Sequence, residues 1–379
     1  MGRNIGFLTS VKTKTSKVNE IMQSHAQDRF MLFRKRNPLA VAGLLLSVST
    51  FIVPVRSPGQ SPAQSDCAAA NAAAHYVPIK SIDFSSKHNI MIHNEDGTLT
   101  PMDEPYYRST LIAPGTWRIE SDGDDQYLIE GDKEALAIDT GYGAGNIRAY
   151  MQTLTKKPLR FVANTHDHFD HTANDAYFDC AYMSAETAKK ATIPFQSFAG
   201  LSFPRNYPKV IVSDEYKIQL GNREIEVFII PNHTAGGTAF LDRRERIFFT
   251  GDEIFQGNNT MSDTGSVAQY ERNMAKLEAH RSEFDKLATG GFGVIDATWV
   301  DKFLANTRYI LAGHEGDPVT QQGRRPQPPS DPSAPVIYRR RFPRPGDAAT
   351  PPSTTPLEFM RKMTYDGCSI TYDIRHIQN

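Results

Sequence analysis

The chain has 379 residues, of which 39% are hydrophobic and 22% are charged, so it is long enough to bury one large domain or two smaller ones. Its 42 Lys and Arg residues against 43 Asp and Glu residues exclude a global field that would attract nucleic acid or an anionic membrane surface. The three cysteines form neither a dense disulfide scaffold nor a zinc ribbon, so a metal site in this chain needs His and carboxylate ligands.

Residues 1–56 predict an N-terminal extension that contains an export signal. A basic cluster at residues 34–36 precedes an apolar run over residues 39–55, and residues 1–30 are polar, so we expect translation to start at Met31. The run is shorter than the ~20 residues that span a bilayer. We therefore expect a secreted or periplasmic protein with no stable membrane insertion after signal cleavage; an uncleaved anchor is the alternative.

Residues 57–105 are expected to be a linker and an N-terminal segment that precede the main folded domain. The stretch 57–74 is rich in Ser, Pro, Gln and Ala, which bury too little apolar surface to offset the entropy of ordering. The interpretation is an unstructured linker.

A folded domain is predicted over residues 106–320, from two groups of strands separated by helices. The first group has strands at 117–120, 126–130, 135–138 and 161–163, with an amphipathic helix at 147–154 before the last of them. The second group has strands at 210–212, 225–230, 239–241 and 247–249, then a helix at about 266–281 and a final core strand at 309–312.

Residues 321–379 are expected to form an exposed arm rich in Pro and Arg, and then a terminal edge strand at 369–374. The arm carries a basic patch. Without interleaved aromatic residues, such a patch is typical of a solvated loop, and docking to an anionic partner is the alternative. The patch consists of Arg324, Arg325, Arg339, Arg340, Arg341 and Arg344.

The strongest chemical signal is an HxHxDH pattern that follows a predicted strand and precedes a helix. His166 and His168 are two residues apart, so on extended backbone both imidazoles project to the same side and can bind one ion. Asp170 and His171 are adjacent where the backbone turns toward the helix, so they can serve a neighbouring ion. The pattern predicts two metal sites side by side.

With these residues in view, the chain resembles the metallo-β-lactamase superfamily over roughly residues 112–318. The other motifs of that family are found in order: Asp139 in AIDTG, His233 in PNHTAGG, Asp252 in FTGD and His314 in LAGHEG. The resemblance implies an α/β fold, the four-layer αββα metallo-β-lactamase sandwich of two mixed sheets flanked by helices.

The resemblance also implies a ligand set. A first ion is held by His166, His168 and His233, and a second by Asp170, His171 and His314; Asp252 bridges both, and Asp139 supports the ligand loop. We expect two Zn²⁺ ions per chain, although manganese or iron would tolerate the same donors.

The expected function is a metal-dependent hydrolase of a small-molecule substrate, with no nucleic-acid partner. A hydroxide shared by the two ions would attack an ester, lactone, thioester or lactam bond, with Asp170 as the catalytic residue that orients it and carries its proton. Asp252, where some zinc β-lactamases have Cys, makes the site more similar to glyoxalase II and lactonases. The alternatives are a phosphodiesterase or a sulfur dioxygenase on the same metals, and a catalytically silent metal-binding interaction protein.

Overall fold

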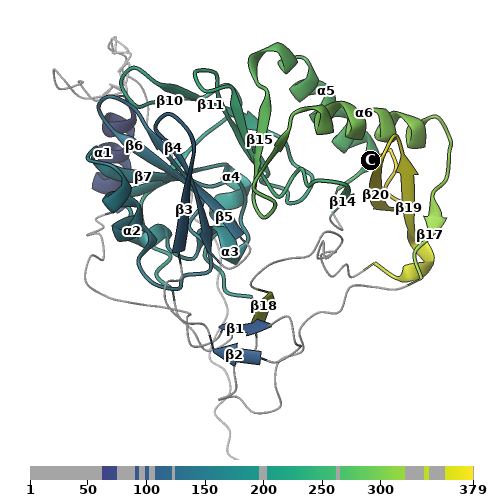
Figure 1. The fold of residues 1–379 in the computed structure, drawn as a ribbon, viewed down its shortest axis with the longest axis horizontal. Coiled ribbons are helices and arrows are strands. Elements are labelled where there is room, and N and C mark those ends of the chain that lie inside the picture. The colour runs from purple at the N-terminus through teal and green to yellow at the C-terminus, as the bar shows by residue number, and fades with distance from the viewer. Residues whose placement is uncertain are drawn as a thin grey trace, which may run out of the picture. The chain divides into compact units, whose positions relative to one another are not determined.

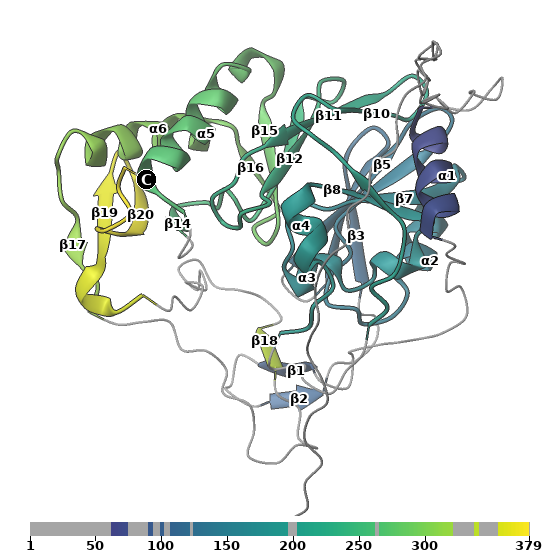
Figure 2. The same ribbon diagram turned by 180° about the vertical axis from the view of Figure 1, so that it is seen from behind.

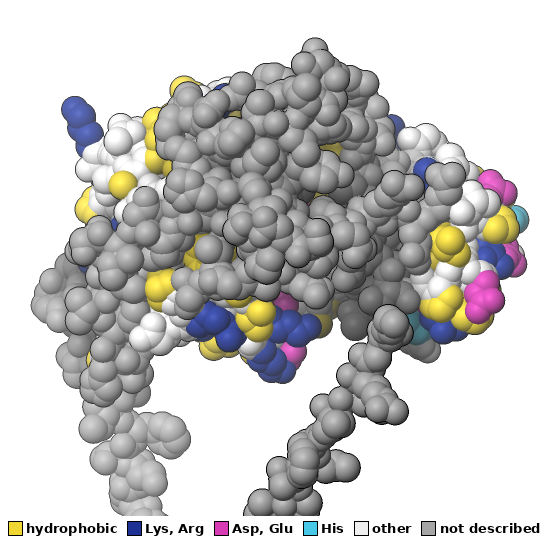
Figure 3. Space-filling view, turned by 90° about the horizontal axis from the view of Figure 1, so that it is seen from below, with side chains coloured by type: hydrophobic (Ala, Val, Ile, Leu, Met, Phe, Trp, Pro, Cys, Tyr) yellow, Lys and Arg dark blue, Asp and Glu magenta, His cyan; other side chains and the backbone are white. Residues whose placement is uncertain are grey.

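The computed structural model describes residues 62–74, 90–93, 99–101, 107–121, 124–195, 203–261, 265–320, 337–340 and 355–378. All of them fall within the second of two compact units, which begins at Pro54. The predicted export signal and most of the arginine-rich arm lie outside the described residues. Figure 3 shows basic, acidic and apolar side chains interspersed on the described part of one face, as the balanced charge of the chain leads us to expect.

The first sheet has seven strands in the order β3-β4-β5-β6-β7-β8-β9. Pairing is antiparallel from β3 to β6 and parallel from β6 to β9. All four residues of β6 are buried, as expected of a parallel strand covered on both faces. The strands are β3 (Tyr107–Ala113), β4 (Thr116–Ser121), β5 (Asp124–Glu130), β6 (Ala135–Ile138), β7 (Leu159–Ala163), β8 (Cys180–Met183) and β9 (Lys209–Ile211).

The second sheet has six strands in the order β10-β11-β12-β13-β15-β16. An antiparallel meander runs from β10 to β13, β13 pairs with β15 in parallel, and β16 closes the sheet antiparallel to β15. The strands are β10 (Lys217–Gln219), β11 (Glu224–Ile229), β12 (Thr238–Asp242), β13 (Ile247–Gly251), β15 (Lys286–Thr289) and β16 (Val294–Asp296).

The two sheets pack face to face, and helices cover their outer faces (Figures 1 and 2). A buried cluster that includes Phe161 and Phe240 fills the space between the sheets. A second cluster joins α2 (Ile147–Leu154) to the outer face of the first sheet, and a third joins α5 (Val267–Glu278) and α6 (Thr298–Leu311) to the outer face of the second. The predicted four-layer αββα fold is confirmed.

Polar side chains cap the first turn of two helices. Asn146 accepts a hydrogen bond from the backbone N–H of Ala149 at the start of α2, and Ser266 caps α5 in the same way through Gln269. Two shorter helices, α3 (Phe169–Thr172) and α4 (Ala185–Lys190), follow β7 and β8.

The prediction of a strand at 309–312 is wrong, because these residues form the last turn of α6. Ile310, in this last turn, continues the helical spacing of Phe303 and Leu304, and all three side chains are buried. Gly313 follows with a φ of 99°, which suits the residue after a helix end.

A third, four-stranded sheet, in the order β14-β20-β19-β17, packs beside α6. β20 lies between β14 and β19, so the predicted terminal strand is an internal strand and not an edge. Its Ile370 and Tyr372 join the core under α5 and α6. The strands are β14 (Asn258–Thr260), β17 (Asp317–Pro318), β19 (Met360–Tyr365) and β20 (Cys368–Asp373); a separate small sheet contains β1 (Ile90–His93), β2 (Leu99–Pro101) and β18 (Ile337–Arg340).

The segment expected to be a linker contains a helix, α1 (Pro62–Ala74), which corrects that prediction. Cys67, on α1, forms a disulfide with Cys180 at the start of β8, and Cys368 is a buried free thiol. The alanine-rich half of the segment favours helix, and the disulfide fixes it against the first sheet. In the part of the chain that the structure describes, no helix has the length and apolar character needed to cross a bilayer.

Candidate metal centre

The predicted site residues lie at the carboxyl ends of strands from both sheets. Asp139 follows β6 and His166 follows β7, two neighbouring parallel strands of the first sheet. Asp252 follows β13, and His233 lies in the loop between β11 and β12 of the second sheet. The ends of parallel strands in α/β folds commonly form ligand sites, because loops from several strands converge there.

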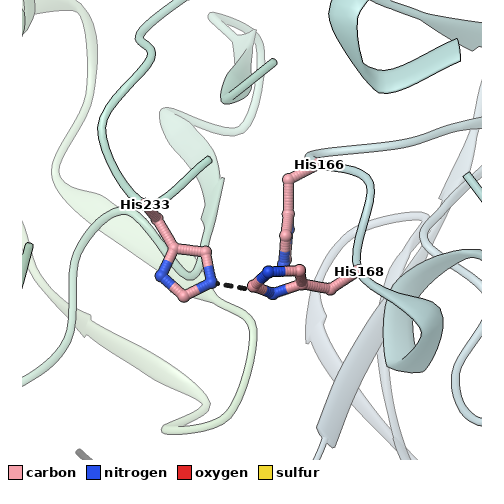
Figure 4. Close-up of side chains that lie close together, drawn as sticks. All are labelled: His166, His168 and His233. Carbon is pink, nitrogen blue, oxygen red and sulfur yellow. Dashed lines mark hydrogen bonds between the residues drawn. The ribbon is translucent and has the colours of Figure 1, made fainter. Parts of the chain in front are cut away.

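His166, His168 and His233 form the centre of the site (Figure 4). One nitrogen of each ring lies within 4.8 Å of a nitrogen of each other ring. Nε2 of His233 is 3.1 Å from Nδ1 of His168, and the His166 ring lies 4.7 and 4.9 Å from the rings of His168 and His233. Extended backbone at His168 and the turn into α3 place two of these imidazoles on the same side, as predicted.

A second group consists of His166, His171 and Asp252. Oδ1 of Asp252 is 3.5 Å from Nε2 of His171, and its Oδ2 is 3.6 Å from Nε2 of His233. The Asp252 carboxylate therefore lies between the two groups, where a bridging ligand is expected. Asp170 is also adjacent, with its Oδ2 4.0 Å from Nε2 of His171.

Asp139 supports His171 through Nδ1, the ring nitrogen that does not face the donor cluster. Its Oδ2 is 3.0 Å from Nδ1 of His171 and accepts a 2.6 Å hydrogen bond from the hydroxyl of Thr165. Oδ1 accepts from the backbone N–H of Thr165 at 2.8 Å. Asp139 thus leaves Nε2 of His171 facing the cluster, the arrangement in which a carboxylate orients a histidine ligand.

Glu253 is a supporting residue that sequence reasoning missed. The backbone N–H of His233 donates to both of its carboxylate oxygens, at 3.0 and 2.9 Å. Burial raises the pKa of Glu253 to about 8, although backbone N–H groups of His233, Asn232 and Thr234 oppose that rise. In the sequence, a glutamate next to Asp252 is typical of an exposed surface residue. Only the tertiary fold places Glu253 under the loop that carries His233.

The structure does not bring His314 to this cluster, which corrects the prediction that it is a metal ligand. His314 is exposed just after α6, and its ring stacks on Tyr309 at 3.7 Å with an interplanar angle of 6°. Among the described residues, His314 belongs to neither group of donor atoms. The motif match failed because α6 directs this turn toward β19 and β20.

The histidines respond differently to burial. Burial, together with the neighbouring imidazoles, holds the pKa of His166 well below its ordinary value and lowers the pKa of His233 to about 3. Burial also opposes protonation of His171, but Asp252, Asp170 and Asp139 raise its pKa well above the ordinary range. At neutral pH, His166 and His233 are therefore neutral imidazoles, the form that binds metal.

The two carboxyl groups of the cluster also differ. Burial works against the charged form of Asp252, but the positive charge of His171, whose Nε2 lies 3.5 Å away, lowers the pKa of Asp252 to about 2. Burial raises the pKa of Asp170 above its ordinary value. One carboxylate is thus fixed as an anion, and the other is better suited to exchange a proton.

These residues fit a bound metal ion. In the described part of the chain, the buried Nε2 atoms of His166 and His171 have no hydrogen-bond partner. Buried polar atoms are rarely left in that state, and a metal ion would satisfy both. The donor types, imidazole and carboxylate, are those that zinc accepts.

Partly buried phenylalanines flank the donors. The Phe195 ring lies 5.9 Å from the His168 ring and 6.0 Å from Phe169. Beyond Asp252, Phe255 and Phe292 contact each other with centroids 5.2 Å apart. Apolar aromatic side chains therefore lie beside His168.

Comparisons with known proteins show the family of this chain. Residues 123–295 match the family described as the metallo-beta-lactamase superfamily. The chain is 31% identical to a probable metallo-hydrolase of Methanocaldococcus jannaschii over 183 residues, 44% of this chain and 86% of that protein.

Two other relatives are matched over about half of their length. They are the alpha subunit of 2,4-dinitroanisole O-demethylase from Nocardioides sp. (28% identical; 41% of this chain and 48% of the relative) and an acyl-coenzyme A thioesterase of Homo sapiens (24%; 35% and 58%). Among solved structures, a metallo-beta-lactamase from Pseudomonas aeruginosa in its mono-zinc form aligns with a TM-score of 0.45 at 17% identity, covering 55% of this chain and 98% of that one.

Proposed function

Because the chain belongs to the metallo-β-lactamase superfamily, we propose that it is a metal-dependent hydrolase that cleaves an ester, thioester, lactone or lactam bond in a small molecule. The observation that carries the proposal is the convergence of His166, His168 and His233 with ligand nitrogens within 4.8 Å of one another. Two loops from different sheets supply these imidazoles, so the fold itself builds the cluster.

Zinc is the metal we propose. Three imidazoles that leave a further position open are typical of catalytic zinc sites, whereas manganese and iron accept the same donors less selectively. His171, Asp170 and Asp252 would hold a second ion beside the first. When bound, zinc lowers the pKa of a coordinated water and polarises the bond under attack.

The side chains around the cluster have distinct tasks in this proposal. Asp170, whose pKa burial raises, would accept a hydrogen bond from the attacking water and take its proton. Asp252 would keep its negative charge between the two donor groups. Asp139 and Glu253 would hold His171 and His233 in place.

A thioester is the first substrate class to test. The Homo sapiens relative is named as an acyl-coenzyme A thioesterase, and another relative, from Francisella tularensis, is named as a hydroxyacylglutathione hydrolase. Phe195, whose ring lies 5.9 Å from the His168 ring, would contact an apolar acyl group beside the scissile bond.

We also propose that the protein is exported. A disulfide such as Cys67–Cys180 persists in oxidising compartments and is rare in the cytosol, which supports that proposal. Fractionation of cells that express the full chain, followed by mass determination of the mature protein, tests it. Recovery of full-length chain from the cytosol with reduced Cys67 and Cys180 would contradict it.

The function is tested with the full chain after metal removal and reloading. Wild type and His233→Ala are assayed with acyl thioesters, lactones, nitrocefin and bis-nitrophenyl phosphate, with His314→Ala as a matched histidine control. We expect metal-dependent hydrolysis of a thioester, lactone or lactam that His233→Ala loses and His314→Ala keeps. Turnover of the phosphodiester alone would favour the phosphodiesterase alternative, and turnover of none with metal bound would favour the silent binding protein.

A further inference from the structure

The two groups of metal donors share a residue. His166 belongs both to the group with His168 and His233 and to the group with His171 and Asp252. One ring nitrogen can bind only one ion. An ion at the three imidazoles therefore leaves a second ion with His171, Asp170 and the shared carboxylate of Asp252.

The loop that does lie beside Asp252 and His171 carries no metal-binding side chain. This glycine loop, residues 290–293, follows β15 and has the sequence Gly-Gly-Phe-Gly. A Cβ atom at Gly290 would lie 2.0 Å from Oδ1 of Asp252 and 2.9 Å from Cε1 of His171. The backbone therefore occupies the place from which a further ligand side chain would approach.

Both sheets hold the glycine loop in this position. The N–H of Gly290 donates to the carbonyl of Gly251 at 2.9 Å, and the N–H of Asp125 donates to the carbonyl of Gly290 at 2.8 Å. The Asp125 carboxylate accepts from the N–H of Gly293 at 2.6 Å, and the hydroxyl of Tyr127 donates to the carbonyl of Thr289 at 2.6 Å. The loop is too well fixed to move aside for a more distant donor.

We propose that the two metal positions are unequal: one ion binds tightly to His166, His168 and His233, and a second binds only weakly to Asp170, His171 and Asp252. This inference rests on the proposed function, because it concerns the same site. The tight position has three imidazoles already gathered within 4.8 Å, so binding costs little reorganisation. The weak position has one imidazole and two carboxylates, one of which is shared.

Metal binding to the full chain tests the proposal without any substrate. The metal-free protein is titrated with zinc against a chromophoric chelator, and the zinc content is measured after gel filtration. We expect one retained ion per chain and a second dissociation constant at least about 100-fold larger. His168→Ala should lose the tight ion, His171→Ala should keep it, and His314→Ala should change neither affinity.

Retention of two ions with similar affinities would overturn the proposal, and so would a His314→Ala variant that binds the second ion more weakly. A failure of this inference can be told apart from a failure of the proposed function. A chain with one tight ion that hydrolyses nothing would refute the function alone, whereas hydrolysis by a chain with two equally tight ions would refute this inference alone.

Discussion

Nδ1 of His171 lies 3.0 Å from Oδ2 of Asp139. The two residues come from different elements: Asp139 follows β6, and His171 lies on α3. The contact joins two loops of the first sheet behind the donor cluster. It also fixes which nitrogen of His171 faces a metal, since Nδ1 is occupied by the carboxylate.

Asp139→Asn should weaken metal binding without unfolding the protein. The amide keeps the shape of the side chain but removes the charge that orients His171, so we expect the affinity for the second ion, which His171 would bind, to fall by about 10- to 100-fold. Competition with a chelator measures this. The exposed Asp301→Asn variant is the control, and an equal loss of affinity in both variants would show that the His171 contact is not the cause.

Glu253→Ala should destabilise the His233 loop. Removing the carboxylate leaves the backbone N–H of His233 buried without its two acceptor oxygens, which costs about 1–3 kcal/mol of unfolding free energy. Glu253→Gln keeps one acceptor oxygen and should recover part of that loss. Urea unfolding measures stability, and the visible spectrum of the cobalt-substituted protein reports on His233; unchanged values for Glu253→Ala in both would refute the role of this residue.

Asp125 should make stability depend on pH in the mildly acidic range. Burial raises its pKa to about 6 in the folded chain, although Arg118 opposes the rise. The folded state holds this proton more tightly than the unfolded state does. Protonation of Asp125 therefore contributes fully to the unfolding free energy below the ordinary aspartate pKa of 3.8, and this contribution is lost as the pH rises through about 6. Asp125→Asn should flatten the plot of unfolding free energy against pH over this window, and an unchanged slope would contradict the assignment.

The Cys67–Cys180 disulfide should stabilise the folded domain. It closes a loop of 113 residues and holds α1 against β8, so reduction or a Cys67→Ser, Cys180→Ser double variant should lower the unfolding free energy by about 2–4 kcal/mol. Urea unfolding with and without reductant measures it. Reductant should leave the double variant unaffected; an equal effect on both proteins would show that the reductant does not act through this disulfide.

Phe195→Ala should raise KM for substrates with an apolar group while leaving metal content unchanged. The loss of apolar contact beside His168 is expected to weaken binding by about tenfold, the equivalent of ~1.4 kcal/mol. Leu111→Ala, which removes a side chain that is 60% exposed, is the control. If the KM values of the two variants change equally, Phe195 does not contact substrate.

The convergence of His166 and His168 could be predicted from the sequence because their geometry is local. The spacing of His166 and His168 on extended backbone, just before α3, determines that both rings point the same way. His233 and Asp252 could be placed because each ends or follows a strand with a clear apolar pattern. The order of the family motifs along the chain then indicates that residues from both sheets contribute to one site.

The errors concern features that only tertiary packing decides. The apolar residues of the last turn of α6 also fit a strand pattern, and the LAGHEG match that follows them favours His314 as a ligand although the helix directs it elsewhere. Similarly, the composition of residues 62–74 predicts an unstructured linker, but these residues form a helix that a disulfide to β8 holds in place. Gly290 gave no signal at all, since its importance lies in a close approach to Asp252 across the fold.

The most direct test of the central claim is a crystal structure of the zinc-loaded full chain with anomalous scattering data recorded at the zinc edge. We predict a zinc peak bonded to ring nitrogens of His166, His168 and His233 at about 2.0–2.1 Å. A zinc peak at another place, or loaded crystals in which these three imidazoles carry no metal, would contradict it.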